Sequence, residues 1–168
     1  MSREHPACMN YSEQNYLQVI NVLLSHCSRE RMKMYELEIE AAIDNLGEVL
    51  AFVDEKLEEA GCLPKVQIQI DIAVEEIFVN IAHYAYVPDT GQVKIGLEIT
   101  RDDNMIITFI DRGKAYDPLK KADPDLTLSA DERPIGGLGI YMVKKSMDDM
   151  RYYRSDSRNI LVLTKKIK

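Results

Sequence analysis

The sequence predicts an α+β fold, a two-layer α/β sandwich in which helices cover one face of a mixed, mainly antiparallel sheet. Two observations support this class. Residues 35–41 and 92–99 alternate apolar and polar side chains, which is typical of strands with one buried face and one wet face. The predicted elements follow in the order helix, strand, helix, helix, strand, strand, loop, helix, strand, strand, which fits helices packed on one side of a sheet.

Length and composition indicate one soluble domain. Of 168 residues, 46% are hydrophobic and 29% are charged, so we expect neither disorder nor a membrane span. The formal net charge of −7 argues against nucleic acid as the main ligand, because proteins that bind the phosphate backbone usually present a basic surface. The start of the chain lacks a secretory signal pattern, and Cys8, Cys27 and Cys62 read as free thiols, which together favour the cytoplasm.

The first part of the chain is predicted to be an N-terminal helical extension over residues 1–33. Within it, residues 13–26 carry an apolar pattern compatible with a short amphipathic helix. The main domain is then expected to span residues 34–168.

In the main domain, the strict alternation of residues 35–41 predicts the first strand. Asp44 or Asn45 can cap a helix that ends at Gly61. A second helix is predicted over residues 64–86, because Pro64 suits a first helical position.

The second half of the domain is expected to contain a hairpin, a long loop and a closing unit. Residues 102–104 read as a turn between strands 93–99 and 105–110. The polar loop 114–135 is too long to be idle in a compact domain, and we interpret it as a lid. The elements expected after it are helix 138–150 and strands 152–154 and 160–166.

Glu76 and Asn80 are the first candidate site residues. They lie four positions apart, so a helix places them on one face, one above the other. A carboxylate there can act as a general base, and a carboxamide oxygen is a hard ligand suited to Mg²⁺. The alternative interpretation is an exposed helix face on which a glutamate and an asparagine lie four residues apart by chance.

Asp111 and Gly113 form the second candidate. An aspartate at the end of an apolar strand can accept a hydrogen bond from an exocyclic amine such as that of adenine, and a glycine two residues later lets a purine ring approach the backbone. A common strand-ending turn is the alternative interpretation.

The third candidate is a glycine cluster, Gly136, Gly137 and Gly139, at the start of helix 138–150. Clustered glycines at a helix N-terminus let backbone N–H groups approach phosphate oxygens. A Rossmann fingerprint is excluded because no strand precedes the glycines, and a P-loop is excluded because Gly-Lys-Ser/Thr is absent. A flexible hinge is the alternative.

Taken in order over residues 34–168, these motifs resemble the GHKL (Bergerat-fold) ATPase superfamily. Within it, the sequence is most similar to stand-alone ATP-binding domains of the anti-sigma-factor serine/threonine kinase type. The phrases that carry the resemblance are residues 72–86 (IAVEEIFVNIAHYAY), Asp111-Arg112-Gly113 with Asp117-Pro118, and residues 137–143 (GLGIYMV).

The resemblance implies a role for each candidate and implies the cofactors ATP and Mg²⁺. Asn80 would bind Mg²⁺ and Glu76 would be the catalytic base. Asp111 would hold the adenine amine above Gly113, and the glycine cluster would face the phosphates. His83 also matches the family pattern, where packing explains it better than catalysis.

The resemblance further implies a regulatory protein kinase. Such a protein would transfer the γ-phosphate of ATP to a serine or threonine of a STAS-type antagonist, would sequester a sigma factor, and could form a homodimer. The alternative from a different class is a non-catalytic partner switch, in which nucleotide orders the lid and so exposes or hides a protein-binding surface.

Two positions depart from the family pattern. The family carries an arginine on the helix after the first strand, whereas residues 44–52 contain none; Arg112 or Arg133 could substitute. Asn159 and Ile160 stand where relatives have a Gly-Thr step that bridges adenine through water. Phosphoryl transfer is therefore less firmly implied than ATP binding.

Overall fold

The computed structural model describes residues 33–120, 122–124 and 138–168. Their framework is a five-stranded sheet with strand order β1-β2-β3-β5-β4, in which each neighbouring pair is antiparallel. The strands are β1 (Lys33–Glu40), β2 (Gln92–Ile99), β3 (Asn104–Asp111), β4 (Asp149–Ser155) and β5 (Arg158–Lys166).

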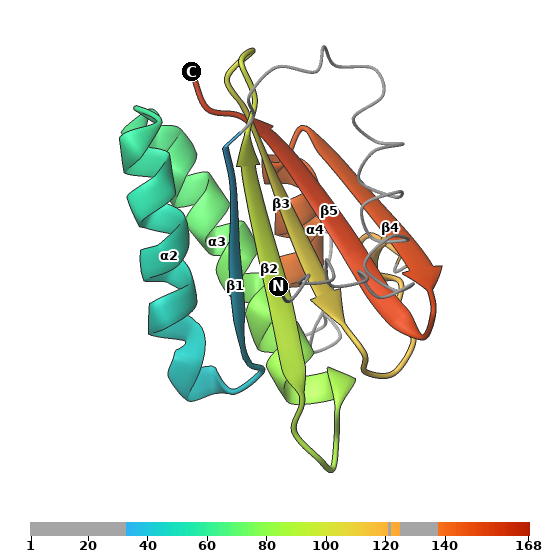
Figure 1. Cartoon of the computed structure of the whole chain (residues 1–168). Helices are drawn as coiled ribbons and strands as arrows, with labels where there is room; N and C mark the ends of the chain where they lie inside the picture. Colours follow the sequence, from blue (N-terminus) through green and yellow to red (C-terminus); the bar gives the residue numbers. More distant parts are fainter. Residues whose placement is uncertain (1–32, 121, 125–137) are drawn as a thin grey trace, which may run out of the picture. The chain divides into compact units, whose positions relative to one another are not determined.

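Figure 1 shows the long helices on one face of this sheet, which confirms the predicted α+β sandwich. The helices are α2 (Leu46–Glu59), α3 (Pro64–Asn80) and α4 (Leu138–Ser146). Shorter segments are the 3-10 turns η1 (Ile43–Asn45) and η3 (Pro118–Lys120), and the π-helix η2 (Ile81–Ala85) that continues α3. No helix among the described residues is long and apolar enough to cross a bilayer.

The core lies between the sheet and the helices. Strand periodicity sends alternate side chains of β2 and β3 to one face, where they meet the apolar stripes of the helices. The fully buried residues include Val49, Val53 and Leu57 of α2, Ile70, Val74 and Phe78 of α3, Val93, Ile95 and Leu97 of β2, and Met105 and Ile107 of β3.

Helix α2 begins and ends close to its predicted limits, but the predicted cap works differently. Asn45 occupies the N-cap position, yet its amide makes no capping bond and donates instead to the Glu40 carbonyl at 3.0 Å. The 3-10 turn before the helix explains this, because it gives Asn45 a helical backbone rather than the extended one of a capping residue. Gly61 has φ +70°, as expected for a residue that ends a helix.

Helix α4 is shorter than the predicted 138–150. It ends at Ser146, and Met150 belongs to β4. The side chain of Asp148 accepts hydrogen bonds from the Lys166 backbone N–H at 2.7 Å and the Lys165 ammonium at 2.8 Å. These bonds to β5 hold residue 148 beside the sheet, so the helix ends before it.

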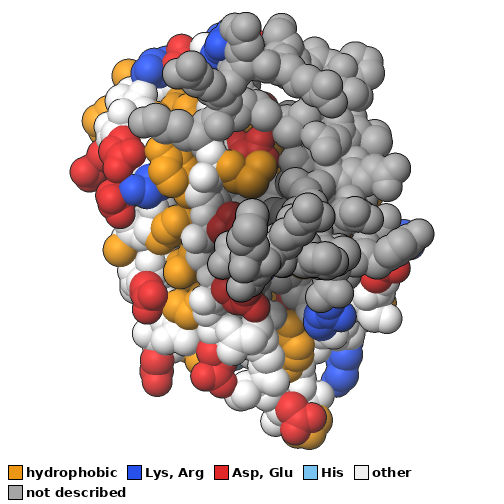
Figure 2. All heavy atoms as spheres, viewed as in Figure 1, with side chains coloured by type: hydrophobic (Ala, Val, Ile, Leu, Met, Phe, Trp, Pro, Cys, Tyr) orange, Lys and Arg blue, Asp and Glu red, His pale blue; other side chains and the backbone are white. Residues whose placement is uncertain are grey.

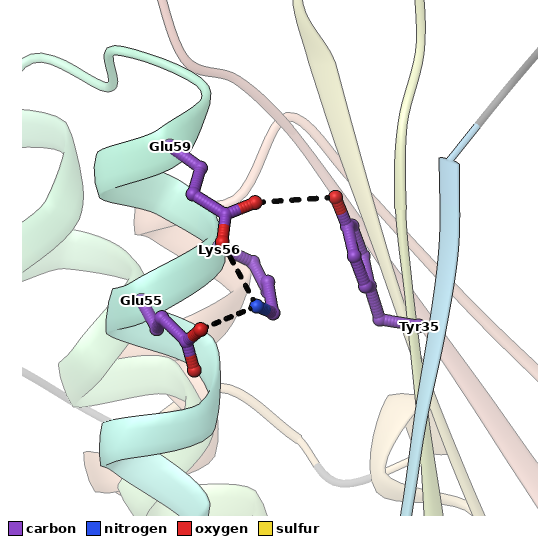
Figure 3. Close-up of polar contacts among 4 residues, drawn as sticks. All are labelled: Tyr35, Glu55, Lys56 and Glu59. Atoms are coloured by element: carbon purple, nitrogen blue, oxygen red, sulfur yellow. Dashed lines mark hydrogen bonds and ion pairs between the residues drawn. The ribbon is translucent and has the colours of Figure 1, made fainter.

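A polar cluster joins α2 to the edge strand β1 (Figure 3). Lys56 lies between Glu55 and Glu59, at 2.7 and 3.0 Å, and its ammonium stands 5.0 Å from the centre of the Tyr35 ring. The Tyr35 hydroxyl donates to Glu59 at 3.4 Å. Figure 2 shows charged side chains, many of them acidic, over the margin where α2 lies. Ion pairs whose carboxylates are exposed, as those of Glu55 and Glu59 are, contribute little to stability.

Several predicted features lie outside the described residues. These are the helix expected at 13–26, Gly136, Gly137, Arg133 and most of the expected lid. The division at residue 33 therefore stays a prediction.

Candidate functional site

Helix α3 carries two of the candidate residues at its C-terminal end. Its apolar residues Ala73, Ile77 and Phe78 are buried against the sheet, while Glu76 and Asn80 are only half-buried. The Asn80 amide donates to the Glu76 carboxylate at 2.7 Å and to the Glu76 carbonyl at 2.6 Å. The predicted stacking of the pair is therefore confirmed. Both hydrogen bonds use the amide nitrogen, so within the described part of the chain they leave the carboxamide oxygen of Asn80 open to a ligand.

Gly139, in the first turn of α4, lies directly against this pair. A Cβ built at position 139 would collide with all three terminal atoms of the Glu76 carboxylate. A glycine here therefore allows the Glu76 carboxylate to keep its present position, whereas a larger residue would displace that carboxylate; the sequence pattern alone does not reveal this contact.

Asp111 ends β3 at the other side of the same region. Its exposed fraction is 6%, and its register partners are Val93 on β2 and Asn159 on β5. The carboxylate oxygen Oδ1 accepts hydrogen bonds from the Gly113 backbone N–H and from the Asn159 amide, both at 2.8 Å. Burial raises the pKa of Asp111, while the two hydrogen bonds and the charge of Arg154 oppose that rise.

Gly113 places the chain after β3 against the end of the π-helix. A Cβ at Gly113 would overlap the Ala85 carbonyl, and the next N–H, of Lys114, donates to that carbonyl at 2.8 Å. Gly113 is buried and is not among the described residues that line the cavity, whereas Asp111, Lys114 and Ala85 around it are, so its role as the floor of a pocket stays a prediction.

Tyr86 fixes the end of the helical segment to two strands. Its hydroxyl donates to the Gln92 carbonyl at the start of β2 and accepts the Arg112 backbone N–H, the latter at 2.8 Å. The ring fills the space where Gly91 would carry a Cβ. The helix that holds Glu76 and Asn80 is thereby aligned with the strand that holds Asp111.

These elements enclose a cavity of about 670 Å³, within the range of small-molecule and cofactor sites. Polar candidates from two elements face it together: Glu76 and Asn80 from α3, and Asp111 from β3. Its apolar wall is formed by Ile77, Val79, Ile81, Phe109, Ile140 and Leu161. A ligand with an apolar part and a polar or charged part suits such a lining.

The cavity also has walls that the sequence analysis did not assign to the site. Tyr116, Tyr152 and Asn159 line it, and His83 stands at its rim, exposed, with its ring edge-on to Tyr84 at 5.8 Å. The signal for Asn159 is its place at the start of the last strand, where it replaces the expected Gly-Thr step.

Neither arginine named as a substitute is found in the described lining of the cavity. Among the described residues that line it there is no arginine. Arg112 is exposed, and Arg154 is not among the described lining residues but donates to Asn159 and to the Gly113 carbonyl next to the cavity. Arg112 is therefore not supported as a substitute for the missing arginine, and Arg133 lies outside the described residues.

Comparisons with known proteins agree with this geometry. A family model described as a histidine kinase-like ATPase domain matches residues 39–165. The chain is 29% identical over 101 residues to the serine/threonine-protein kinase BtrW of Bordetella bronchiseptica, covering 60% of this chain and 70% of that protein. It is 28% identical over 95 residues to the serine-protein kinase RsbW of Bacillus cereus, covering 54% of this chain and 59% of that protein.

A crystal structure of the RsbU and RsbW domains of a Mycobacterium tuberculosis protein has the same fold. Its TM-score is 0.57 at 20% identity, over 79% of this chain and 32% of that chain. The five-stranded antiparallel sheet, the cavity beside it and the match over most of the chain lead to one conclusion. This chain belongs to the family of histidine kinase-like ATPase domains, within the GHKL superfamily.

Proposed function

We propose that this chain binds Mg·ATP in the cavity and transfers the γ-phosphate to a serine or threonine hydroxyl of a partner protein. One observation carries the proposal. A candidate base, a candidate metal ligand and a candidate acceptor for the adenine amine, Glu76, Asn80 and Asp111, line the same cavity.

The adenine would lie at the Asp111 end. Within the described residues, both hydrogen bonds to this carboxylate fall on Oδ1, which leaves Oδ2 for the exocyclic amine of the base. Phe109 and Leu161 supply apolar surface for the purine faces. Gly113, whose N–H binds Oδ1, would support this end from behind the lining residues Lys114 and Ala115.

The phosphates would lie at the Glu76–Asn80 end, near the N-terminus of α4. Gly136, Gly137 and Gly139 are the candidates for backbone contacts with them. The donor set suits magnesium, because the carboxamide oxygen of Asn80 is a hard ligand that its hydrogen bonds to Glu76 leave unused. Bound there, Mg²⁺ would neutralise charge on the phosphate oxygens.

Glu76 would act as the base. In the transfer, the serine or threonine oxygen forms a bond to the γ-phosphorus while the bond from that phosphorus to the β–γ bridging oxygen breaks. The hydroxyl proton passes to the Glu76 carboxylate, and ADP leaves. The amide of Asn80 holds that carboxylate at 2.7 Å and so orients it.

The partner proposed is a small STAS-type antagonist protein, with a sigma factor sequestered when the antagonist is phosphorylated. The chain would then act as a cytoplasmic regulator, as a monomer or a homodimer. Support comes from the relatives, which are named serine or serine/threonine kinases. The absence of an arginine from residues 44–52 favours the second candidate, a non-catalytic switch that binds nucleotide and partners without transferring phosphate.

Single-turnover phosphotransfer separates the two functions. The full chain would be mixed with radiolabelled Mg·ATP and a candidate STAS-type protein, and binding of Mg·ADP would be measured in parallel by calorimetry. A kinase labels the partner on serine or threonine. A switch binds nucleotide and leaves the partner unlabelled, and a chain that binds no nucleotide would overturn both functions.

A further inference from the structure

Asn159 is the best-connected polar side chain at the Asp111 end of the cavity. It is 6% exposed at the start of β5. Its amide nitrogen donates to Asp111 Oδ1 at 2.8 Å and to the Lys114 carbonyl at 2.9 Å. Its carboxamide oxygen accepts the Tyr152 hydroxyl at 2.7 Å and an Arg154 N–H at 2.6 Å.

These neighbours fix which way the amide points. A guanidinium can only donate, so the atom facing Arg154 must be the oxygen of Asn159. A backbone carbonyl can only accept, so the atom facing Lys114 must be the nitrogen. The amide therefore has one permitted orientation, in which it donates to Asp111.

Arg154 strengthens this arrangement from the solvent side. The same nitrogen that reaches Asn159 also donates to the Gly113 carbonyl at 3.1 Å. Arg154 thus ties the edge strand β4 to the turn after Asp111, although its own residue surface is largely exposed. Hydrogen bonds from a charged donor are the stronger ones.

We propose that Asn159, locked by Arg154 and Tyr152, is a positioning residue that makes the pocket select a 6-amino purine over a 6-oxo purine. It occupies Oδ1 of Asp111 and so turns the remaining oxygen, an acceptor, toward the base. This inference rests on the proposed binding of an adenine nucleotide at Asp111.

The selection follows from hydrogen-bond polarity. The exocyclic amine of adenine donates and satisfies an acceptor. The 6-carbonyl of hypoxanthine accepts hydrogen bonds, so in this pocket it would face the Asp111 oxygen, which also accepts, in a buried place. A buried site that pairs with an amine therefore strongly disfavours a base that carries a carbonyl at that position. Without Arg154 and Tyr152, the Asn159 oxygen loses its two shortest hydrogen bonds, and only the nitrogen is still fixed, by the Lys114 carbonyl. Asn159 and Asp111 can then shift, so the hydrogen-bond polarity at the base becomes less strictly defined.

The test measures binding of Mg·ADP and Mg·IDP by calorimetry, because these diphosphates differ in the 6-substituent and cannot donate a γ-phosphate. The variants are Asn159→Leu, which removes the amide, and Arg154→Met and Tyr152→Phe, which remove donors to its oxygen from more accessible positions. Arg151→Met is the matched control, since this exposed arginine of β4 pairs with Asp149 at 2.7 Å. Thermal unfolding establishes that each variant is folded.

We expect wild type and Arg151→Met to favour ADP over IDP by the same factor, and Arg154→Met combined with Tyr152→Phe to reduce that factor about tenfold. Asn159→Leu should reduce it at least as much if it folds. Equal loss of ADP and IDP affinity, with the ratio unchanged, would overturn the selective role and leave a structural one. A wild type that binds ADP and IDP equally would overturn the inference but not nucleotide binding, whereas a wild type that binds neither would overturn the proposed function itself.

Discussion

At the Asp111 end of the cavity, strand ends hold each polar group in place, whereas at the Glu76 end the polar side chains come from one turn of α3, with Gly139 of α4 packed against them. Asp111 and Asn159 are register partners in the sheet, and backbone and side-chain donors surround them. Glu76 and Asn80 bond mainly to each other, across one turn of α3. The first end is buried and the second is half-buried.

The difference matches what each end would have to do. Recognition of a base needs a fixed pattern of donors and acceptors, which a sheet register provides without reorganisation. Chemistry on a phosphate needs groups that can exchange partners when ligand arrives, and a pair that satisfies itself can do so. Substitutions at the two ends should therefore separate binding from turnover.

The largest effect is expected at the helical end, from Glu76→Gln. This change keeps the size of the side chain and removes the base, so phosphotransfer should fall by roughly 10²-fold or more while nucleotide affinity stays close to wild type. Rapid-quench single-turnover assays and calorimetry measure the two quantities. Glu75→Gln, one position away and exposed, is the control. Parallel loss of ATP affinity in Glu76→Gln would show that the carboxylate maintains the site and is not its base.

At the strand end, Asp111→Asn should weaken binding without a separate effect on chemistry. An asparagine can still accept from Gly113 and Asn159 with its oxygen, but its amide would then face the donor amine of adenine. We expect a loss of roughly 1.5–3 kcal/mol in Mg·ADP binding, measured by calorimetry. Unchanged affinity would remove Asp111 from the base site.

A smaller effect is expected from Gly139→Ala, which places a methyl group where the Glu76 carboxylate lies. To reach ordinary contact with this methyl group, at 3.4 Å or more, the carboxylate has to move by more than about 1 Å, which should lower phosphotransfer roughly tenfold or more. Gly47→Ala is a matched control, because a Cβ there has nothing within 4 Å and α2 should gain up to about 1 kcal/mol in unfolding free energy. Equal phosphotransfer by both variants would mean that Glu76 can move freely.

The smallest effect concerns the packing of α2 against α3, the helix that carries Glu76. Burial raises the pKa of Asp71 to about 7, and the charge of the nearby Asp54 and a hydrogen bond between the two carboxyl groups act in the same direction. The folded chain therefore holds this proton between about pH 4 and pH 7 while the unfolded chain releases it, and the unfolding free energy should fall as pH rises through that range.

Asp71→Asn mimics the protonated side chain at every pH. It should stabilise the fold at pH 8 by about 1–2 kcal/mol after allowance for solvent screening, and should match wild type near pH 4. Urea unfolding at both pH values measures this, with exposed Asp89→Asn as control. Equal pH slopes for wild type and Asp71→Asn would show that Asp54 and Asp71 do not share a proton.

Much of the Asp111 end of the cavity is predictable from the sequence. Alternating apolar and polar residues indicate strands, and the point where the apolar pattern stops indicates the last residue of a strand. Asp111 is a site candidate on that basis, and it lines the cavity. Asn159 stands out in the sequence only as a departure from a pattern. Its pairing with Arg154 and Asp111 depends on three strands meeting, and such contacts between distant segments leave no periodic signal.

The helical end shows a different limit. The spacing of Glu76 and Asn80 predicts their stacking, since helix geometry is local. The change from α3 to a π-helix at Ile81, and the early end of α4 at Ser146, are not predicted. Both depend on contacts with strands, through Tyr86 in one case and Asp148 in the other, and local propensity does not contain them.

The π-helix has a consequence for insertions and deletions in this chain. A π turn accommodates one more residue than an α turn, so loss of a single residue from 81–85 would let α3 continue as an ordinary helix. Because the π turn holds its extra residue within about one turn, the shortened helix would still direct Tyr86 toward Gln92 and Arg112. Loss of a residue from α3 itself would instead rotate everything beyond it by about 100° about the helix axis and take Tyr86 away from the strands. A one-codon deletion within 81–85 should therefore disturb the alignment of the two ends of the cavity less than a one-codon deletion within α3.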